Sequence, residues 1–212
     1  MLKRITVFTF ALGISILLVG CGRNVLDAAD IPTGPEYASY TSPDGLIENF
    51  AEAWRHRDIV EYRDCVLYDG AALASDGLAY EPFMFYFIRP DAEYGSAWDY
   101  EAECEHSEAL FSGNPARGGA VPGVDHIELS LLPMGDWEAP GNPLGIGGDA
   151  YPEGTLSCDF ATDMEITLKG SVAGGIDALY VRDRVRFYAI PVDAGGAVEY
   201  RLWKWMDLDN GQ

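Results

Sequence analysis

Basic residues are scarce in this sequence of 212 residues. It contains 14 lysines and arginines against 34 aspartates and glutamates, so the formal net charge is −20. Proteins that bind nucleic acids or lie flat on anionic lipid head groups need basic patches, and the composition argues against both classes. An excess of carboxylates is instead typical of a solvated surface that resists association.

Common signatures of catalysis and metal binding are also missing. The sequence has no GxSxG nucleophile motif, no Walker loop and no pair of metal ligands at a usual spacing. It has no CxxC, and the spacing of Cys65, Cys104 and Cys158 fits no zinc site. We therefore expect no metal and no cofactor, and no motif identifies an activity.

The N-terminal apolar run is too short to cross a membrane. Two cations, Lys3 and Arg4, precede a run of about 15 mainly apolar residues, whereas a spanning helix needs about 20. The run ends in Leu18-Val19-Gly20-Cys21, which resembles the lipobox of bacterial lipoproteins. The resemblance implies removal of residues 1–20 and lipidation of Cys21, with the membrane as partner through the acyl chains. Gly22 follows where an Asp would favour the inner membrane, so an outer-membrane anchor facing the periplasm is expected.

Export bears on the remaining three cysteines and on the charge. Cleavage would remove two basic residues and leave a formal charge of −22. An exported chain can form disulfides, but three thiols allow at most one intramolecular pair. The alternative is that Cys65, Cys104 and Cys158 are all small buried side chains, and the sequence leaves both open.

The rest of the chain divides into a tether and one domain. Residues 21–41 contain Pro32 and Gly34 and little periodicity, which predicts a flexible tether after Cys21. Residues 42–208 are long enough for one domain with its own core.

Helices are predicted in the first half of the domain. Ser42 and Pro43 are typical of a helix start, and apolar residues then recur every three or four positions up to Trp54. Asp58 is expected to start a second helix after a short turn, and Ser96 a third that ends at Phe111.

Strands are predicted around and after these helices. An aromatic segment, 83–88, predicts an early strand, and alternation over 126–132 predicts one with Ile127, Leu129 and Leu131 on a single face. Gly-Gly turns separate three further predicted strands. These strands span 155–168, 176–190 and 197–207.

The order of these elements resembles nuclear transport factor 2-like domains. The segment Tyr200–Asp207, with sequence YRLWKWMD, is similar to their last strand, and Ser42–Leu46 with the following helix hairpin is similar to their start. The resemblance implies an α+β fold, in which a cone-shaped, curved antiparallel sheet packs on an N-terminal helix hairpin and a third helix. It also implies a deep apolar cavity.

Few side chains are candidates for catalysis. Related cones include isomerases and dehydratases that use an Asp or His at the cavity floor, so His126, Asp163 and Glu165 are the weak alternatives here. His126 is better explained as an exposed strand residue beside an acid. Arg182, Arg184 and Arg186 would share a strand face and bind an anion, or pair with acids on the next strand.

Taken together, the sequence predicts a membrane-anchored exported lipoprotein that is a non-catalytic binding or structural module. Its ligand would be a small apolar molecule in the cavity, or a protein on the sheet face. Aromatic residues that would line such a surface are Tyr180, Tyr188, Trp203 and Trp205, although core packing also explains each of them. The alternative function is an isomerase-like or dehydratase-like enzyme.

Overall fold

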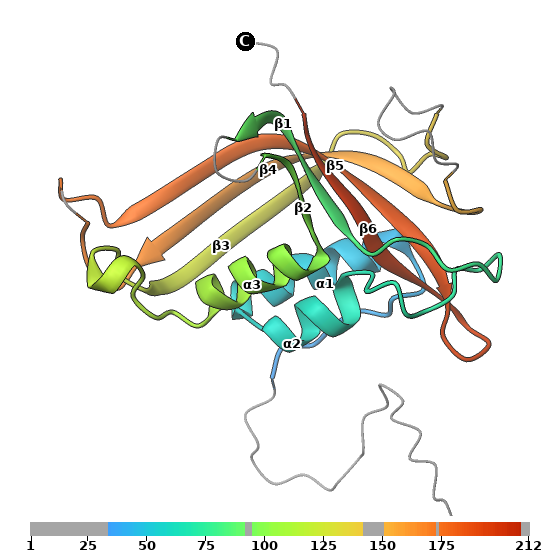
Figure 1. Ribbon diagram of the computed structural model, residues 1–212, viewed down its shortest axis with the longest axis horizontal. Coiled ribbons are helices and arrows are strands. Elements are labelled where there is room, and N and C mark those ends of the chain that lie inside the picture. The colour runs from blue at the N-terminus through green and yellow to red at the C-terminus, as the bar shows by residue number, and fades with distance from the viewer. Residues whose placement is uncertain (1–33, 92–94, 142–150, 173, 209–212) are drawn as a thin grey trace, which may run out of the picture. The chain divides into compact units, whose positions relative to one another are not determined.

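Helices line the concave side of a curved, six-stranded sheet in the computed structural model (Figure 1). The structure describes residues 34–91, 95–141, 151–172 and 174–208, and its folded unit begins at Pro35. The predicted signal and Cys21 lie outside the described residues. The helices are α1 (Pro43–His56), α2 (Ile59–Glu61), the π-helix η1 (Tyr62–Val66), α3 (Tyr100–Phe111) and the 3₁₀-helix η2 (Arg117–Gly119). The strands are β1 (Met84–Asp91), β2 (Gly95–Asp99), β3 (Val124–Pro133), β4 (Leu156–Leu168), β5 (Ala178–Asp193) and β6 (Val198–Leu208).

The sheet is mixed. Its strand order is β2-β1-β6-β5-β4-β3, and every neighbouring pair is antiparallel except β1 and β6. The expectation of a wholly antiparallel sheet is therefore wrong at this pair, because β1 and β6 lie far apart in sequence and no hairpin turn forces them to run in opposite directions. The expected α+β class, with helices on a curved sheet, is confirmed.

Helix α1 has the start and the buried stripe that its sequence predicts. Ser42 Oγ accepts a hydrogen bond from Gly45 N at 3.1 Å, and Pro43 occupies the first turn. Leu46, Phe50 and Trp54 are at most 7% exposed. The helix ends at His56, and the residue after it, Arg57, caps the helix with a left-handed φ of 53°.

The second and third helices differ from the prediction. Asp58 caps α2 as expected, but α2 is one turn long and continues as η1. Residues 95–99 form β2 rather than the start of α3, because they pair with the aromatic strand β1, where Trp98 lies 5.5 Å from Phe85. Asp99 then caps α3 by accepting from Ala102 N at 2.9 Å.

The long strands follow the sequence closely. Ile127 and Leu129 are buried on one face of β3, whereas His126 and Glu128 are exposed on the other. Both Gly-Gly turns contain positive φ angles, for example 99° at Gly174.

Residues 35–41, which we call the strap, belong to the folded unit, so their assignment to the flexible tether is wrong. Asn49 is fully buried and holds the strap at Ala38, accepting from Ala38 N at 2.6 Å and donating to Ala38 O at 3.0 Å. Tyr40 donates to Glu61 at 2.6 Å, and its ring lies under the Arg201 guanidinium. These polar contacts fix a segment whose sequence shows no periodicity.

Candidate functional site

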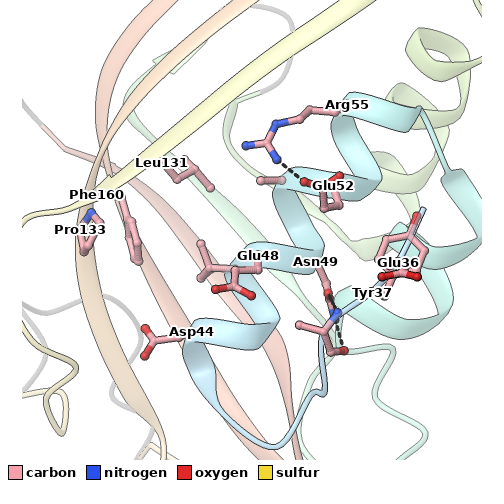
Figure 2. Close-up of a pocket in the computed structure, with 13 residues that line it drawn as sticks. Glu36, Tyr37, Asp44, Glu48, Asn49, Glu52, Arg55, Leu131, Pro133 and Phe160 are labelled. Carbon is pink, nitrogen blue, oxygen red and sulfur yellow. Dashed lines mark hydrogen bonds and ion pairs between the residues drawn. The ribbon is translucent and has the colours of Figure 1, made fainter.

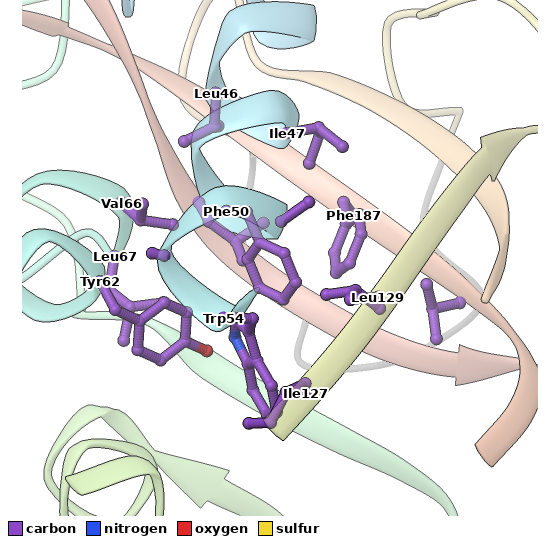
Figure 3. Packing of buried hydrophobic residues seen from close by; sticks show 14 of the residues in the cluster. Leu46, Ile47, Phe50, Trp54, Tyr62, Val66, Leu67, Ile127, Leu129 and Phe187 are labelled. Atoms are coloured by element: carbon purple, nitrogen blue, oxygen red, sulfur yellow. The ribbon is translucent and has the colours of Figure 1, made fainter. Parts of the chain in front are cut away.

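The space between α1 and the sheet is filled with aromatic side chains (Figure 3). The ring centroid of Phe50 lies 5.3 Å from that of Phe187 and 5.6 Å from that of Trp205. The remaining cavity has a volume of about 10 Å³, which is room for a single water. The deep apolar cavity that the resemblance implied is therefore not found among the described residues. The cavity is lined by Phe50, Trp54, Leu129, Leu131, Thr162, Met164, Phe187 and Trp205.

Two polar atoms at this small cavity are buried without a hydrogen bond. Thr162 Oγ1 and Trp205 Nε1 have no partner among the described residues. Trp54 Nε1 makes no hydrogen bond of good geometry either, but the Tyr62 phenol lies close to it. Burial raises the pKa of that phenol well above its usual value, and the indole opposes only part of this rise. The cavity volume leaves room for no more than one water beside the first two groups.

A buried carboxyl group lies on the other side of the core. Glu103 in α3 is 3% exposed, and its Oε1 accepts from Tyr62 at 2.8 Å and from Ser107 at 2.9 Å. Burial raises the pKa of Glu103, against the lowering effect of these two hydrogen bonds. The hydrogen bond from Tyr62 joins η1 to α3.

A second perturbed carboxyl group lies near the end of β6. Burial, and to a lesser extent the charge of Asp183, raise the pKa of Asp207 to about 6. Such a carboxyl can exchange a proton near neutral pH, which acid–base catalysis requires. Asp207 was not among the acids predicted from the sequence, because nothing local distinguishes a half-buried acid at a strand end from an exposed one.

The three weak catalytic candidates face away from the helices. His126 is half exposed and pairs with Glu128 at 2.7 Å. Asp163 is largely exposed and accepts from Arg182 at 3.3 Å, and Glu165 lies beside it on the same outer face of β4. Asp163 and Glu165 line an open depression of about 300 Å³ on this outer face, beside Tyr180 and Arg182, and none of the three candidates lines the interior cavity.

The arginine cluster on β5 pairs with acidic side chains of the neighbouring strand β4. Arg186 makes two hydrogen bonds to Asp159 on β4, at 2.5 and 3.0 Å, and these raise the pKa of the guanidinium further. Arg184 Nη2 lies 3.8 Å from the same carboxylate. The prediction of cross-strand pairing is confirmed. Because the three arginines already pair with carboxylates on β4, the cluster offers no unpaired cation for an anionic ligand.

The four candidate aromatic residues do not form one surface. Trp205 lies in the core beside Phe50, whereas Tyr188 and Trp203 are buried in a second cluster on the opposite face of the sheet. Tyr180 is 62% exposed and lies 3.4 Å from Glu165. Core packing therefore explains Tyr188, Trp203 and Trp205, and they cannot line a common site with Tyr180.

A groove of about 700 Å³ lies between α1, the strap and the end of β3 (Figure 2). We call it the α1–β3 groove. Its volume is within the usual range for ligand sites, about 300–1,000 Å³. It is lined by Glu36, Tyr37, Ala38, Asp44, Ile47, Glu48, Asn49, Ala51, Glu52, Arg55, Leu131, Pro133 and Phe160.

The α1–β3 groove combines an apolar floor with an acidic rim. Ile47 and Phe160 are buried at the floor. Glu36 and Glu48 are exposed at the rim and make no hydrogen bond or ion pair with another described residue. Asp44 accepts from Trp137 Nε1 at 2.8 Å. The groove therefore has an excess of negatively charged side chains beside its apolar floor.

One cation lies at the inner end of the groove. Arg55 pairs with Glu52 of the same helix and donates to the backbone oxygen of Leu129 at 3.0 and 2.7 Å. The groove was not predicted from the sequence, although Asp44, Glu48 and Glu52 recur every four residues along one face of α1. That spacing is the sequence pattern that could have indicated an acidic wall of the groove. No pattern in the sequence shows that β3 forms the opposite wall.

None of the three described cysteines forms a disulfide bond, and Cys158 is buried. Within the described ranges, no three metal-ligating side chains are grouped closely enough to hold an ion. No described helix has the length and apolar character needed to span a membrane.

Comparisons with known proteins give similarity in fold only. No protein-family model matches the chain. No curated protein matches it. A solved structure of a candidate aromatic ring hydroxylase from Novosphingobium aromaticivorans has a TM-score of 0.49 and 12% identity, over 82% of this chain and 90% of that one.

Two further solved structures are described as nuclear transport factor 2-like. One is from Salmonella enterica, with a TM-score of 0.43 and 9% identity over 79% of this chain and 87% of that one. The other, of unknown function, is from Shewanella oneidensis, with a TM-score of 0.40 and 10% identity over 77% and 93%. At these TM-scores nothing about activity follows, and the fold given above rests on its strand order and helices.

Proposed function

We propose that the chain is an exported lipoprotein, anchored through Cys21, that works as a non-catalytic binding module with the α1–β3 groove as its site. The N-terminal sequence supports the anchor, because cations, apolar run and lipobox occur in the usual order before Cys21. Outer-membrane attachment facing the periplasm is the location that Gly22 favours. Because the strap belongs to the folded unit, about a dozen residues remain between Cys21 and that unit. As a flexible coil these residues would span roughly 20 Å.

The contrast between two spaces carries the binding proposal. The interior cavity has room for one water, whereas the groove has a volume of about 700 Å³. The groove also has rim carboxylates, Glu36 and Glu48, that are not committed to partners in the described structure. A buried apolar floor beside unpaired charge is the surface that an amphipathic cation would complement.

The anchor is tested by metabolic labelling with radioactive palmitate. The wild-type chain should incorporate label and partition into the detergent phase, and a Cys21→Ser variant should do neither. An intact N-terminus or an unmodified Cys21 in the mass spectrum of the native product would contradict the anchor.

The site is tested by binding of a fluorescent octalysine probe at about 150 mM salt, which screens distant charges. Neutralising both rim residues, Glu36→Gln with Glu48→Gln, should weaken binding by about 1–2 kcal/mol. The matched control, Glu101→Gln with Glu105→Gln, removes the same charge from the exposed side of α3. Equal losses in the two double variants would show that net charge alone attracts the probe.

The enzyme alternative retains one observation in its favour, the raised pKa of Asp207. An Asp207→Asn variant that lost a turnover shown by the wild type would establish it. No described pocket contains Asp207, so we place this function second.

A further inference from the structure

One side of strand β3 has no strand partner within the described ranges. Among these residues, β3 is the last strand of the sheet and pairs with β4 alone. Just beyond the strand, Met134 N donates a hydrogen bond to Asp159 O of β4 at 2.8 Å. The main-chain N–H and C=O groups of the even-numbered residues from His126 onward therefore point toward β4. In an antiparallel pair the main-chain groups alternate in direction, so those of Leu129, Leu131 and Pro133 face outward. The hydrogen bonds from Arg55 to Leu129 O agree with this direction.

Helix α1 covers part of this outward edge. Arg55 occupies the carbonyl of Leu129, and Arg57 Nη1 donates to the carbonyl of Val124 at 2.8 Å. The outward N–H and C=O of Leu131 make no hydrogen bond to any other described group. Leu131 and Pro133 both line the α1–β3 groove. A short stretch of unpaired strand edge therefore opens into the groove.

An exposed strand edge is a template for another extended chain. The charge of the groove selects which chain. Glu36, Asp44 and Glu48 surround the opening, and the protein as a whole carries −20. Lysine and arginine side chains of an added strand can lay their aliphatic stems over Ile47 and direct their charges to the rim.

We propose that the α1–β3 groove binds an extended, basic polypeptide segment, which adds as a strand to the free edge of β3 at Leu131. This inference rests on the proposed binding function and specifies its ligand. Main-chain hydrogen bonds to Leu131 supply pairing, and the rim carboxylates supply selection for positive charge. A small polyamine would bind to the rim carboxylates alone, because it has no main-chain groups that could pair with Leu131.

The experiment compares two peptide probes on the full-length chain in detergent. The first is a fluorescent dodecapeptide of alternating lysine and valine, and the second is the same peptide N-methylated at every residue. N-methylation leaves the charges and removes the main-chain donors. We expect the N-methylated peptide to bind at least about tenfold more weakly, and the amide of Leu131 to become protected from hydrogen exchange only with the first peptide.

Variants at Leu131 give a second measurement. Leu131→Pro removes the outward N–H, a change that an edge strand tolerates, and Leu131→Ala is the control for loss of the side chain. Leu131→Pro should bind the unmodified peptide about fivefold more weakly than Leu131→Ala. The thermal transition of each variant shows whether the variant folds. The hydrogen-exchange measurement on the wild-type protein tests the proposal even if neither variant folds.

The outcomes separate the two proposals. If both peptides bind equally and Glu36→Gln with Glu48→Gln weakens both, the groove is a cation site and strand addition is wrong. Displacement by spermine without any protection of Leu131 also shows that strand addition is wrong. If neither peptide depends on the rim carboxylates, the proposed binding function itself is wrong.

Discussion

The buried carboxyl of Glu103 should make the stability of this protein depend on pH in an unusual direction. Burial raises the pKa of Glu103 above its ordinary value of 4.5, so the folded state holds the proton more tightly than the unfolded state. The stability that this proton supplies is fully present below the unfolded-state pKa and is lost as the pH rises through the folded-state pKa.

A Glu103→Gln variant isolates this effect. Gln keeps an acceptor for Tyr62 and Ser107 but cannot ionise. Within the window between the two pKa values, the wild type should lose about 1.4 kcal/mol per pH unit relative to the variant. A constant offset from the new amide group does not matter, because only the slope is compared.

The assay is urea denaturation followed by tryptophan fluorescence, in steps from about pH 5 to about pH 8, where so acidic a chain stays well charged and soluble. Glu101→Gln on the exposed side of α3 is the control, and its stability should run parallel to that of the wild type. If Glu103→Gln also runs parallel to the wild type across this range, Glu103 does not hold a proton in the folded state and the reasoning is refuted.

Three further predictions concern the strap, the small cavity and the end of β6. Asp207→Asn should flatten the pH dependence of stability between about pH 4 and pH 6, where the wild type loses about 1 kcal/mol after allowance for solvent screening of this half-exposed group. Urea titrations at about pH 4.5 and pH 7 measure the difference, and an unchanged slope contradicts the raised pKa. Asn49→Ala removes both hydrogen bonds to the backbone of Ala38, so it should cost about 2–3 kcal/mol and expose the strap to limited proteolysis; resistance equal to wild type would mean that the strap is held without Asn49. Thr162→Val replaces a buried hydroxyl without a partner, so it should raise stability by about 1 kcal/mol in thermal melts, and a fall would show that a bound water or ligand uses the hydroxyl.

Local sequence predicted most of the elements because their signals are short-range. Ser42 and Asp58 cap their helices as expected, since each accepts a hydrogen bond from an amide three residues ahead. Alternation placed Ile127 and Leu129 on the buried face of β3. Ser96 misled the prediction because a capping residue competes there with strand pairing to β1, and pairing is a tertiary contact.

The candidate site was predicted far less well. His126, Asp163 and Glu165 were chosen by residue type, but the twist and register of the sheet put them on its outer face. The rim of the groove combines the strap and α1, which are neighbours in sequence, with β3, which lies far along the chain from both. Only the repeat of acids along α1 was visible beforehand.

The sequence alone determined the acidic character, the helix starts, the strand faces and the Gly-Gly turns, because these depend on composition and on contacts between near neighbours. The tertiary structure decided that aromatic rings fill the interior, that the strap is part of the fold, and that an acidic groove lies beside an open strand edge. Those features require atoms from distant segments to meet, and the volume left between them is set by how their side chains pack.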